Sequence, residues 1–250
     1  MTDPLAPLLD LPGVAEAAEE ARVAVDRLLG HRVLRRRSAE VSAESAVRGA
    51  WASAALDGAG SALADVRSGA ATDPVTQGAL RVATGLGPLV DTWERAPRQV
   101  LARLHLLAAR DLVDPAAPAE ALGRPDPAAA DRLELLSQVL VARTAAPAVV
   151  VAAFVHGELL AGRPFPVGSG VVARAAARLT LVTRGLDPKG LAVPEVGHRE
   201  LAGEYAELAA GYGTPEGVAA WIRHCCAATA LGAREGLAIC EAVLRAPART

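Results

Sequence analysis

Apolar residues recur at helical spacing along most of the chain, and the apolar–polar alternation typical of strands is sustained nowhere. Three Asp-Pro or Thr-Pro pairs place a capping side chain before a proline that suits the first position of a helix. These pairs are Asp73-Pro74, Asp126-Pro127 and Thr214-Pro215. The pattern after Asp73 runs through Val75, Ala79, Val82, Leu86, Leu89, Val90 and Trp93. We therefore predict an all-α chain of about nine helices.

Two successive segments are predicted to be the central helices. Residues 147–161 are apolar almost all round, which is typical of a helix buried at the centre of a domain. Residues 170–184 keep their apolar side chains on one face, and Gly185 is a natural C-terminal stop. A short loop with Gly168 and Gly170 joins these segments. The proline-rich stretch 113–126 is predicted to be an exposed loop.

The chain shows neither an internal repeat nor a clear linker, so a single domain over residues 1–250 is the simplest organisation. We place its core at about residues 40–190, with an N-terminal helix in 1–37 and further helices in 197–250. The long stretch from Thr214 to Ala246 is rich in small residues. It is predicted to be a packing helix or the contact of a homodimer.

Composition narrows the environment and the partners. The hydrophobic fraction is 52% but the aromatic fraction only 3%, so Ala, Leu and Val must fill the core. A net charge of −2 excludes a general electrostatic attraction to nucleic acid or to an anionic membrane. No apolar run approaches the ~20 residues that span a bilayer, and no signal peptide is evident, so we expect a soluble cytoplasmic protein. Lys189 is the only lysine among 26 basic residues, which points to a GC-rich bacterial genome.

Cysteine and histidine patterns give no metal site. The three cysteines form no CxxC pair, and reduced, buried thiols are expected. His105, His198 and His224 are scattered, without the spacing of a metal motif. His224, Cys225 and Cys226 are adjacent, but neighbours on a helix diverge by about 100°, so we interpret them as core.

The glycine loop is the best candidate for a binding site. A glycine loop before a helix directs free backbone N–H groups outward, and the helix dipole adds partial positive charge, so an anion is favoured there. Arg174 lies one turn into the following helix, and Arg163 lies at the other end of the loop. A plain structural turn is the alternative, with Arg163 solvated at the loop edge.

The layout HGELLAGRPFPVGSGVVAR (156–174) resembles the signature HPFx[D/E]GNGRxxR of the Fic/Doc (fido) family, where a helix bearing a histidine also precedes the loop; His156 matches that histidine. The signature positions kept here are Pro164, Phe165, Gly168, Gly170 and Arg174. The four functional positions that differ are Arg163 for the His, Val167 for the acidic residue, Ser169 for the Asn and Val171 for the first Arg. The chain is thus similar to a degenerate Fic protein, which implies a single Fic-like helical domain.

An upstream segment, SAALDG (53–58), resembles the family's inhibitory motif [S/T]xxxE[G/N]. Ser53 and Gly58 fit this motif, and Asp57 stands in the place of its Glu. The resemblance implies that the carboxylate of Asp57 faces Arg174. A separation above about 8 Å, beyond one bridging water, would contradict this expectation.

Family members typically transfer AMP from ATP to a protein hydroxyl, and the substitutions remove the groups for this step. A guanidinium has no acceptor, so Arg163 cannot serve as the base. Val167 offers no oxygen to Mg²⁺, and Val171 cannot contact phosphate. We therefore assign no catalytic residue and no metal ligand, and we expect AMP transfer to be lost.

Binding is the function that remains. The candidate residues for an anion are Arg163, Gly168, Ser169, Gly170 and Arg174. ATP or another nucleotide, bound without Mg²⁺, is one candidate ligand, and a protein partner is another. Two alternatives stay open: an enzyme that uses the same scaffold for a different phosphate- or nucleotide-dependent transfer, and a purely structural helical dimer.

Overall fold

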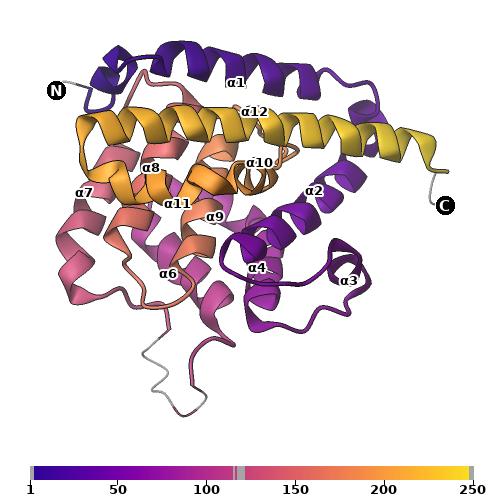
Figure 1. The fold of residues 1–250 in the computed structure, drawn as a ribbon, viewed down its shortest axis with the longest axis horizontal. Coiled ribbons are helices and arrows are strands. Elements are labelled where there is room, and N and C mark those ends of the chain that lie inside the picture. The colour runs from indigo at the N-terminus through magenta and orange to yellow at the C-terminus, as the bar shows by residue number, and fades with distance from the viewer. Residues whose placement is uncertain (1–2, 115, 117–121, 248–250) are drawn as a thin grey trace.

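The computed structural model describes residues 3–114, 116 and 122–247, and in this part of the chain the regular elements are helices, with no strand (Figure 1). The α-helices are α1 (Val14–Leu29), α2 (Leu34–Leu56), α3 (Leu63–Ser68), α4 (Pro74–Gly85), α5 (Val90–Trp93), α6 (Pro97–Ala109), α7 (Ala130–Val141), α8 (Ala148–Gly162), α9 (Ser169–Thr183), α10 (Pro194–Glu200), α11 (Ala202–Ala210) and α12 (Pro215–Arg245). Short 3-10 turns are η1 (Ala6–Asp10), η2 (Gly87–Leu89), η4 (Pro127–Ala129) and η5 (Gly211–Gly213). The all-α prediction is confirmed.

The described residues hold twelve α-helices, more than the number expected from the sequence. The difference arises from α3, α5 and α10, because helices of one or two turns are too short to produce a periodic pattern. The expected loop at 113–126 has no helix in its described residues, and 115 and 117–121 lie outside them. The proposed boundaries of the core and its N- and C-terminal additions stay a prediction.

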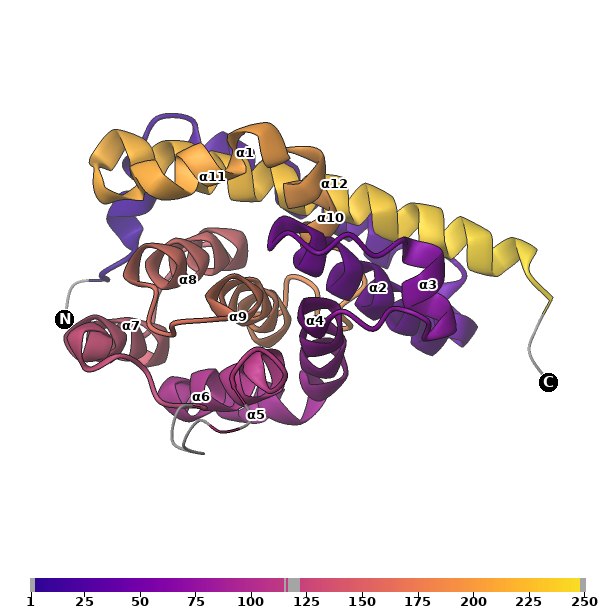
Figure 2. The ribbon, with the colours of Figure 1, turned by 60° about the horizontal axis from the view of Figure 1, so that its bottom comes forward.

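The two central helices were correctly predicted. In Figure 2, α8 and α9 lie between a layer formed by α1, α11 and α12 and a layer formed by α5, α6 and α7, with α4 beside α9. Helix α8 packs against α9, α12, α1, α7 and α11, which explains why its sequence is apolar on every side. Helix α9 packs on its other sides against α2, α4, α5 and α6.

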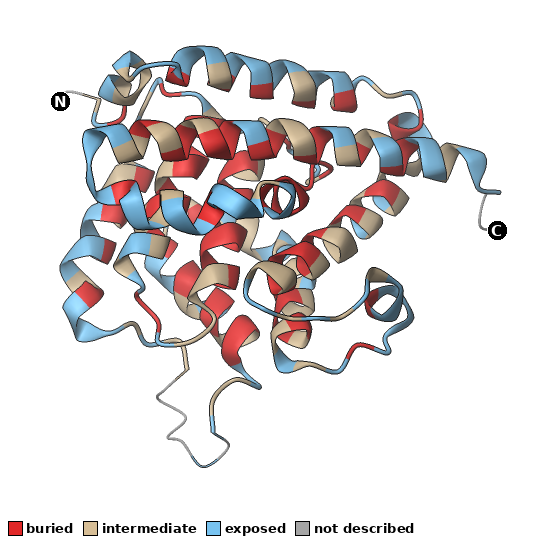
Figure 3. Cartoon of the chain, viewed as in Figure 1, coloured by how far each residue is buried: buried red, intermediate tan, exposed pale blue. Residues whose placement is uncertain are grey.

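The longest helix, α12, covers one side of the domain. Thr214 caps it by accepting the N–H of Gly217, and Pro215 occupies its first turn. It packs against α1, α2, α8 and α10. Figure 3 shows buried residues along most of α12 and on the side of α1 that faces it. The stretch from Thr214 to Ala246 is therefore a packing helix, and its role in a homodimer stays a prediction.

No helix of the described residues is both long enough and apolar enough to cross a bilayer.

Candidate anion site at the glycine loop

The loop between α8 and α9 is held by its buried aromatic residue. Helix α8 ends at Gly162, and Arg163 follows as its C-cap. The Arg163 backbone takes the left-handed conformation (φ 39°) that residues other than glycine rarely adopt, and its side chain is exposed. Pro164 and Phe165 follow and are buried, and the Phe165 ring stacks on His105 with the ring centres 4.2 Å apart. Gly168 then takes φ 70° as the N-cap residue directly before α9. The loop is therefore anchored at its middle and open to solvent at Arg163.

The other substituted positions face the protein. The Ser169 hydroxyl donates a hydrogen bond to the Phe165 carbonyl over 2.7 Å. Val171 is only 4% exposed and belongs to the core cluster beneath the loop. Val167 is half-buried. At these three positions the loop thus presents no carboxylate and no cation to a ligand.

Arg174 is buried and has a partner for each end of its guanidinium group. Its Nε donates to Ser53 Oγ over 2.8 Å, and its Nη2 donates to the Ser53 carbonyl over 2.9 Å. Nη1 donates to the Tyr205 hydroxyl over 3.2 Å. Nη2 also donates to Asp57 Oδ1 over 2.6 Å. The contact between Asp57 and Arg174 that the upstream motif implies is therefore present.

Local structure explains how α2 delivers both partners. Ser53 and Asp57 lie one turn apart at the C-terminal end of α2, so they share a face of the helix. Gly58 follows with φ 92°, a conformation that turns the chain away directly after the carboxylate. The Asp57 side chain remains 24% exposed, whereas that of Arg174 is 2% exposed. Solvent therefore reaches the pair only from the carboxylate side.

Gly170 makes room for this carboxylate. A Cβ atom at position 170 would lie 2.3 Å from Asp57 Oδ1 and 2.7 Å from Oδ2. The carboxylate thus lies against the first turn of α9, where the helix dipole favours negative charge. Burial alone would lower the pKa of Arg174, but the contacts with Tyr205 and Asp57 raise it above its ordinary value.

A solved structure resembles this arrangement of helices. A crystal structure of a Fic family protein from Desulfovibrio desulfuricans G20 superposes with a TM-score of 0.72, covering 91% of this chain and 74% of that chain at 19% sequence identity. The chain has the Fic fold. No family model matches the sequence, and no curated protein matches it.

The Fic fold agrees with the resemblance drawn from the loop signature. Helix α8, the glycine loop and α9 follow one another as expected, and the SAALDG segment of α2 packs against α9. The sequence comparison did not identify Tyr205, which contacts Arg174 from α11. No motif marks this tyrosine, and the packing of α11 on α8, α10 and α12 brings it to the arginine.

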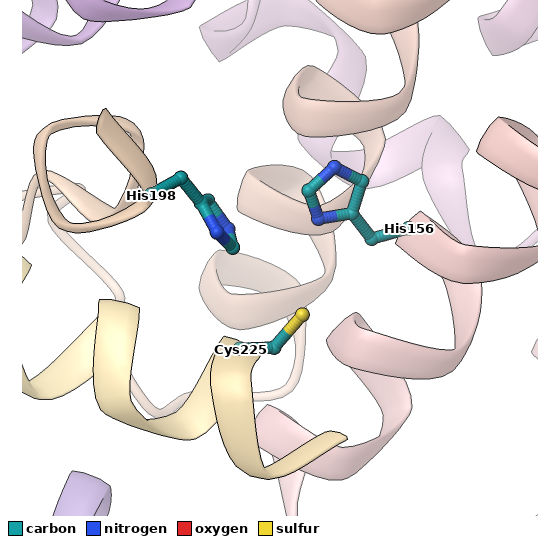
Figure 4. Close-up of side chains that lie close together, drawn as sticks. All are labelled: His156, His198 and Cys225. Carbon is teal, nitrogen blue, oxygen red and sulfur yellow. The ribbon is translucent and has the colours of Figure 1, made fainter. Parts of the chain in front are cut away.

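A second cluster of polar residues lies next to Arg174, around a small cavity that Arg174 also lines. His156 of α8, His198 of α10 and Cys225 of α12 point toward one another (Figure 4), and their ligand atoms all lie within 4.8 Å of each other. The His156 Nε2 atom is 2.9 Å from the Tyr205 hydroxyl, which joins this cluster to Arg174. The sequence pattern predicted no metal site at His198 and assigned Cys225 to the core, because residues so far apart in the chain form no recognisable motif.

The titration of the cluster follows from its burial. Burial holds the pKa of His156 and His198 well below the ordinary histidine value, and the positive charge of Arg174 adds to the effect at His156. Burial also raises the pKa of the Cys225 thiol well above its ordinary value and that of the Tyr205 hydroxyl to about 12. At neutral pH, both imidazoles are therefore neutral and the thiol is protonated. The expectation that Cys225, Cys226 and His224 are buried core residues is confirmed.

Proposed function

We propose that this Fic-fold protein acts by binding and does not transfer AMP. Support comes from the loop, where the position of the family's histidine base holds Arg163, exposed and at the end of α8. A guanidinium stays protonated and has no acceptor, so it cannot take the proton of an attacking hydroxyl. Loss of a general base alone typically lowers a rate by about 10²–10⁴-fold.

Two further positions support the same proposal. Val167 has no oxygen for Mg²⁺, a cation that is bound through oxygen ligands. Val171 is packed in the core and carries no charge for a phosphate. Base, metal ligand and phosphate contact are thus all missing from the positions where the family signature carries them.

The first prediction concerns AMP transfer. Incubation of the full chain with [α-³²P]ATP and a bacterial lysate, with and without Mg²⁺, should leave both this protein and the lysate proteins unlabelled. Asp57→Ala should also stay inactive, because the base remains absent when the carboxylate is removed. Clear labelling that depends on this protein would overturn the proposal.

The binding site that we propose is the N-terminus of α9, with Gly168, Ser169 and Gly170 supplying the backbone and Arg174 the charge. The Asp57 carboxylate lies against this turn and pairs with Arg174. The carboxylate occupies the place that a bound anion would take. Because it is partly exposed to solvent, a ligand can approach from that side and displace it from Arg174. The ligand that fits is the phosphate of a nucleotide, bound without Mg²⁺, or an acidic side chain of a partner protein. Arg163 at the loop edge would add a second positive charge.

The second prediction tests this exchange. Asp57→Ala should lower the free energy of unfolding. Breaking a fully buried pair costs about 3–5 kcal/mol, and the loss here should be smaller because Asp57 is partly exposed. The same change should allow ATP, AMP or inorganic phosphate to raise the melting temperature more than in the unaltered protein, since a ligand of the native state stabilises it. Asp65→Ala, at an exposed aspartate of α3, is the matched control and should behave like the parent.

Absence of any anion-dependent stabilisation in Asp57→Ala would contradict the anion site. The network of Ser53, Asp57, Tyr205 and Arg174 would then be structural, as in the purely structural alternative.

A further inference from the structure

The cluster behind Arg174 combines residue types that bind soft metal ions. His156, His198 and Cys225 come from three different helices, α8, α10 and α12 (Figure 4). Two imidazoles and one thiol form a donor set that suits Zn²⁺ and does not suit Mg²⁺ or Ca²⁺, which prefer oxygen. The three residues are buried, so competing water is scarce around them.

The spacing of the donor atoms is close to that of a metal site. Because all three lie within 4.8 Å of one another, some point lies within about 2.8 Å of each. Zinc bonds to nitrogen and sulfur are about 2.0–2.3 Å long, so shifts of less than about 1 Å would bring the donors into range. Changes of side-chain torsion can supply such shifts without moving a helix.

The hydrogen bonds of the two imidazoles leave suitable nitrogens for a metal. His198 Nδ1 is 3.1 Å from His224 Nε2, and His224 Nδ1 is 3.1 Å from Glu204 Oε1. A proton on each Nδ1 makes a chain from Glu204 through His224 to His198, which leaves His198 Nε2 as the ligand. Carboxylates and neighbouring rings commonly orient zinc-bound histidines in this way.

At His156, the Tyr205 hydroxyl contacts Nε2, so Nδ1 is the nitrogen left for the metal. With metal bound, Nε2–H would donate to the Tyr205 oxygen, which also accepts from Arg174. The metal site would therefore share one hydroxyl with the arginine that holds Asp57.

A small cavity adjoins the cluster. Its volume is about 20 Å³, and its lining includes His156, His198, Cys225 and Arg174. A cavity needs a volume of about 10–15 Å³, measured in the same way, to hold one water molecule. A water molecule therefore has room here as a fourth ligand of the metal. Three protein ligands and one water give the four-coordinate geometry that Zn²⁺ prefers.

The charges around the cluster are balanced. The nearby guanidinium groups belong to Arg174 and Arg178, which line the same cavity. Asp57 pairs with Arg174 over 2.6 Å, and Glu195 pairs with Arg178 over 2.7 Å. An entering cation therefore meets arginines whose charge is already compensated, and a Cys225 thiolate would cancel half of the charge on Zn²⁺.

We propose that His156, His198 and Cys225 bind one Zn²⁺ ion that ties α8, α10 and α12 together. On binding, the Cys225 thiol releases its proton to solvent and the sulfur donates an electron pair to the metal; no redox step is involved. This proposal does not rest on the proposed anion site, although the Tyr205 hydroxyl contacts both His156 and Arg174.

The experiment uses the full chain, reduced, stripped with a chelator and titrated with Co²⁺, which replaces Zn²⁺ and reports a thiolate ligand by a charge-transfer band in the near ultraviolet. We expect this band, together with the visible bands of four-coordinate Co²⁺, to saturate at one ion per chain. One equivalent of Zn²⁺ should abolish both and raise the melting temperature.

Two cysteine variants form a matched pair, because Cys225 and Cys226 are adjacent and both buried. Cys225→Ala should lose the charge-transfer band and bind Zn²⁺ at least about tenfold more weakly. Cys226→Ala should keep the band and the affinity of the parent.

Several outcomes would overturn the proposal. Failure of the unaltered protein to give the band is decisive, and this measurement does not depend on whether a variant folds. A band that persists in Cys225→Ala, or disappears in Cys226→Ala alone, would place the thiolate ligand elsewhere. Stoichiometric binding of Cu⁺ with no binding of Co²⁺ or Zn²⁺ would reject the assignment to zinc.

Discussion

The carboxylate of Asp57 lies so close to the α-carbon of Gly170 that no side chain fits at position 170. The same carboxylate pairs with a buried arginine whose remaining donors are held by Ser53 and Tyr205. Gly170 thus has a role beyond the conformational freedom usually assigned to a loop glycine. It sets how near α2 can bring Asp57 to the start of α9.

The third prediction follows from this contact. Gly170→Ala would place a Cβ 2.3 Å from Asp57 Oδ1 and should displace the carboxylate, at a cost of about 1–3 kcal/mol in unfolding free energy measured with urea. Gly203→Ala is the matched control, since nothing lies within 4 Å of a Cβ there. It should leave stability unchanged or raise it by up to about 1 kcal/mol.

A double-mutant cycle separates the contact with Asp57 from other effects at position 170. In an Asp57→Ala background, Gly170→Ala should cost much less, because the atoms it strikes are gone. Equal costs in the two backgrounds would show that Asp57 is not the obstacle.

At the scale of helices, two crossings depend on a glycine that faces the backbone of another helix. A Cβ on Gly78 of α4 would lie 2.1 Å from the Ala108 carbonyl oxygen of α6. A Cβ on Gly197 of α10 would lie 2.0 Å from the Ala228 carbonyl oxygen of α12. Backbone atoms cannot yield as the end of a flexible side chain can, so these helices would have to separate.

The fourth prediction concerns α10. Gly197→Ala should push α10 away from α12 and destabilise the protein by roughly 1–3 kcal/mol or more in urea unfolding. Because His198 is the next residue on α10, the same variant should also weaken Zn²⁺ binding. Full stability in Gly197→Ala would mean that the two helices are not in close contact.

Sequence reasoning worked best for long helices with one strong signal. The apolar segment 147–161 and the capped helix after Thr214 were both recognised, because burial and capping leave local marks in the sequence. Short α10 has no such mark, and its place is set by its packing on α12 and α2. The contact of Asp57 with Arg174 could be predicted only through the resemblance of SAALDG to the inhibitory motif of the Fic family. The grouping of His156, His198 and Cys225 could not, since it depends on how three helices meet.

At the scale of the whole molecule, four histidines are buried in the interior. Burial lowers the pKa of His156 and His198 well below the ordinary value, and the pKa of His105 and His224 is lowered as well, also chiefly by burial. In the unfolded chain, the same imidazoles have the ordinary histidine pKa of about 6.5. Below that pH the unfolded state binds more protons than the native state, so acid favours unfolding.

The fifth prediction concerns how steeply the free energy of unfolding changes with pH. Without metal, the free energy of unfolding should be highest above about pH 6.5 and fall as the pH decreases toward 5, by up to roughly 1.4 kcal/mol per pH unit for each of His156 and His198. Urea unfolding between about pH 8 and pH 5 measures it. His198→Gln should make the decline shallower, because it removes one of the two histidines that burial keeps neutral. A stability that is constant over this range would contradict the prediction.

The packing of α1 against α12 has a consequence for how the molecule is made. Roughly 200 residues separate the two helices in the chain. At a synthesis rate of about 5–20 residues per second, α1 leaves the ribosome some 10–40 s before its partner. During that interval Val14, Ala21 and Val25, all fully buried in the finished protein, lack the α12 side chains that pack over them. The buried face of α1 therefore stays incompletely covered in the nascent chain until α12 emerges, and we expect chaperones that bind apolar segments to recognise it during that interval.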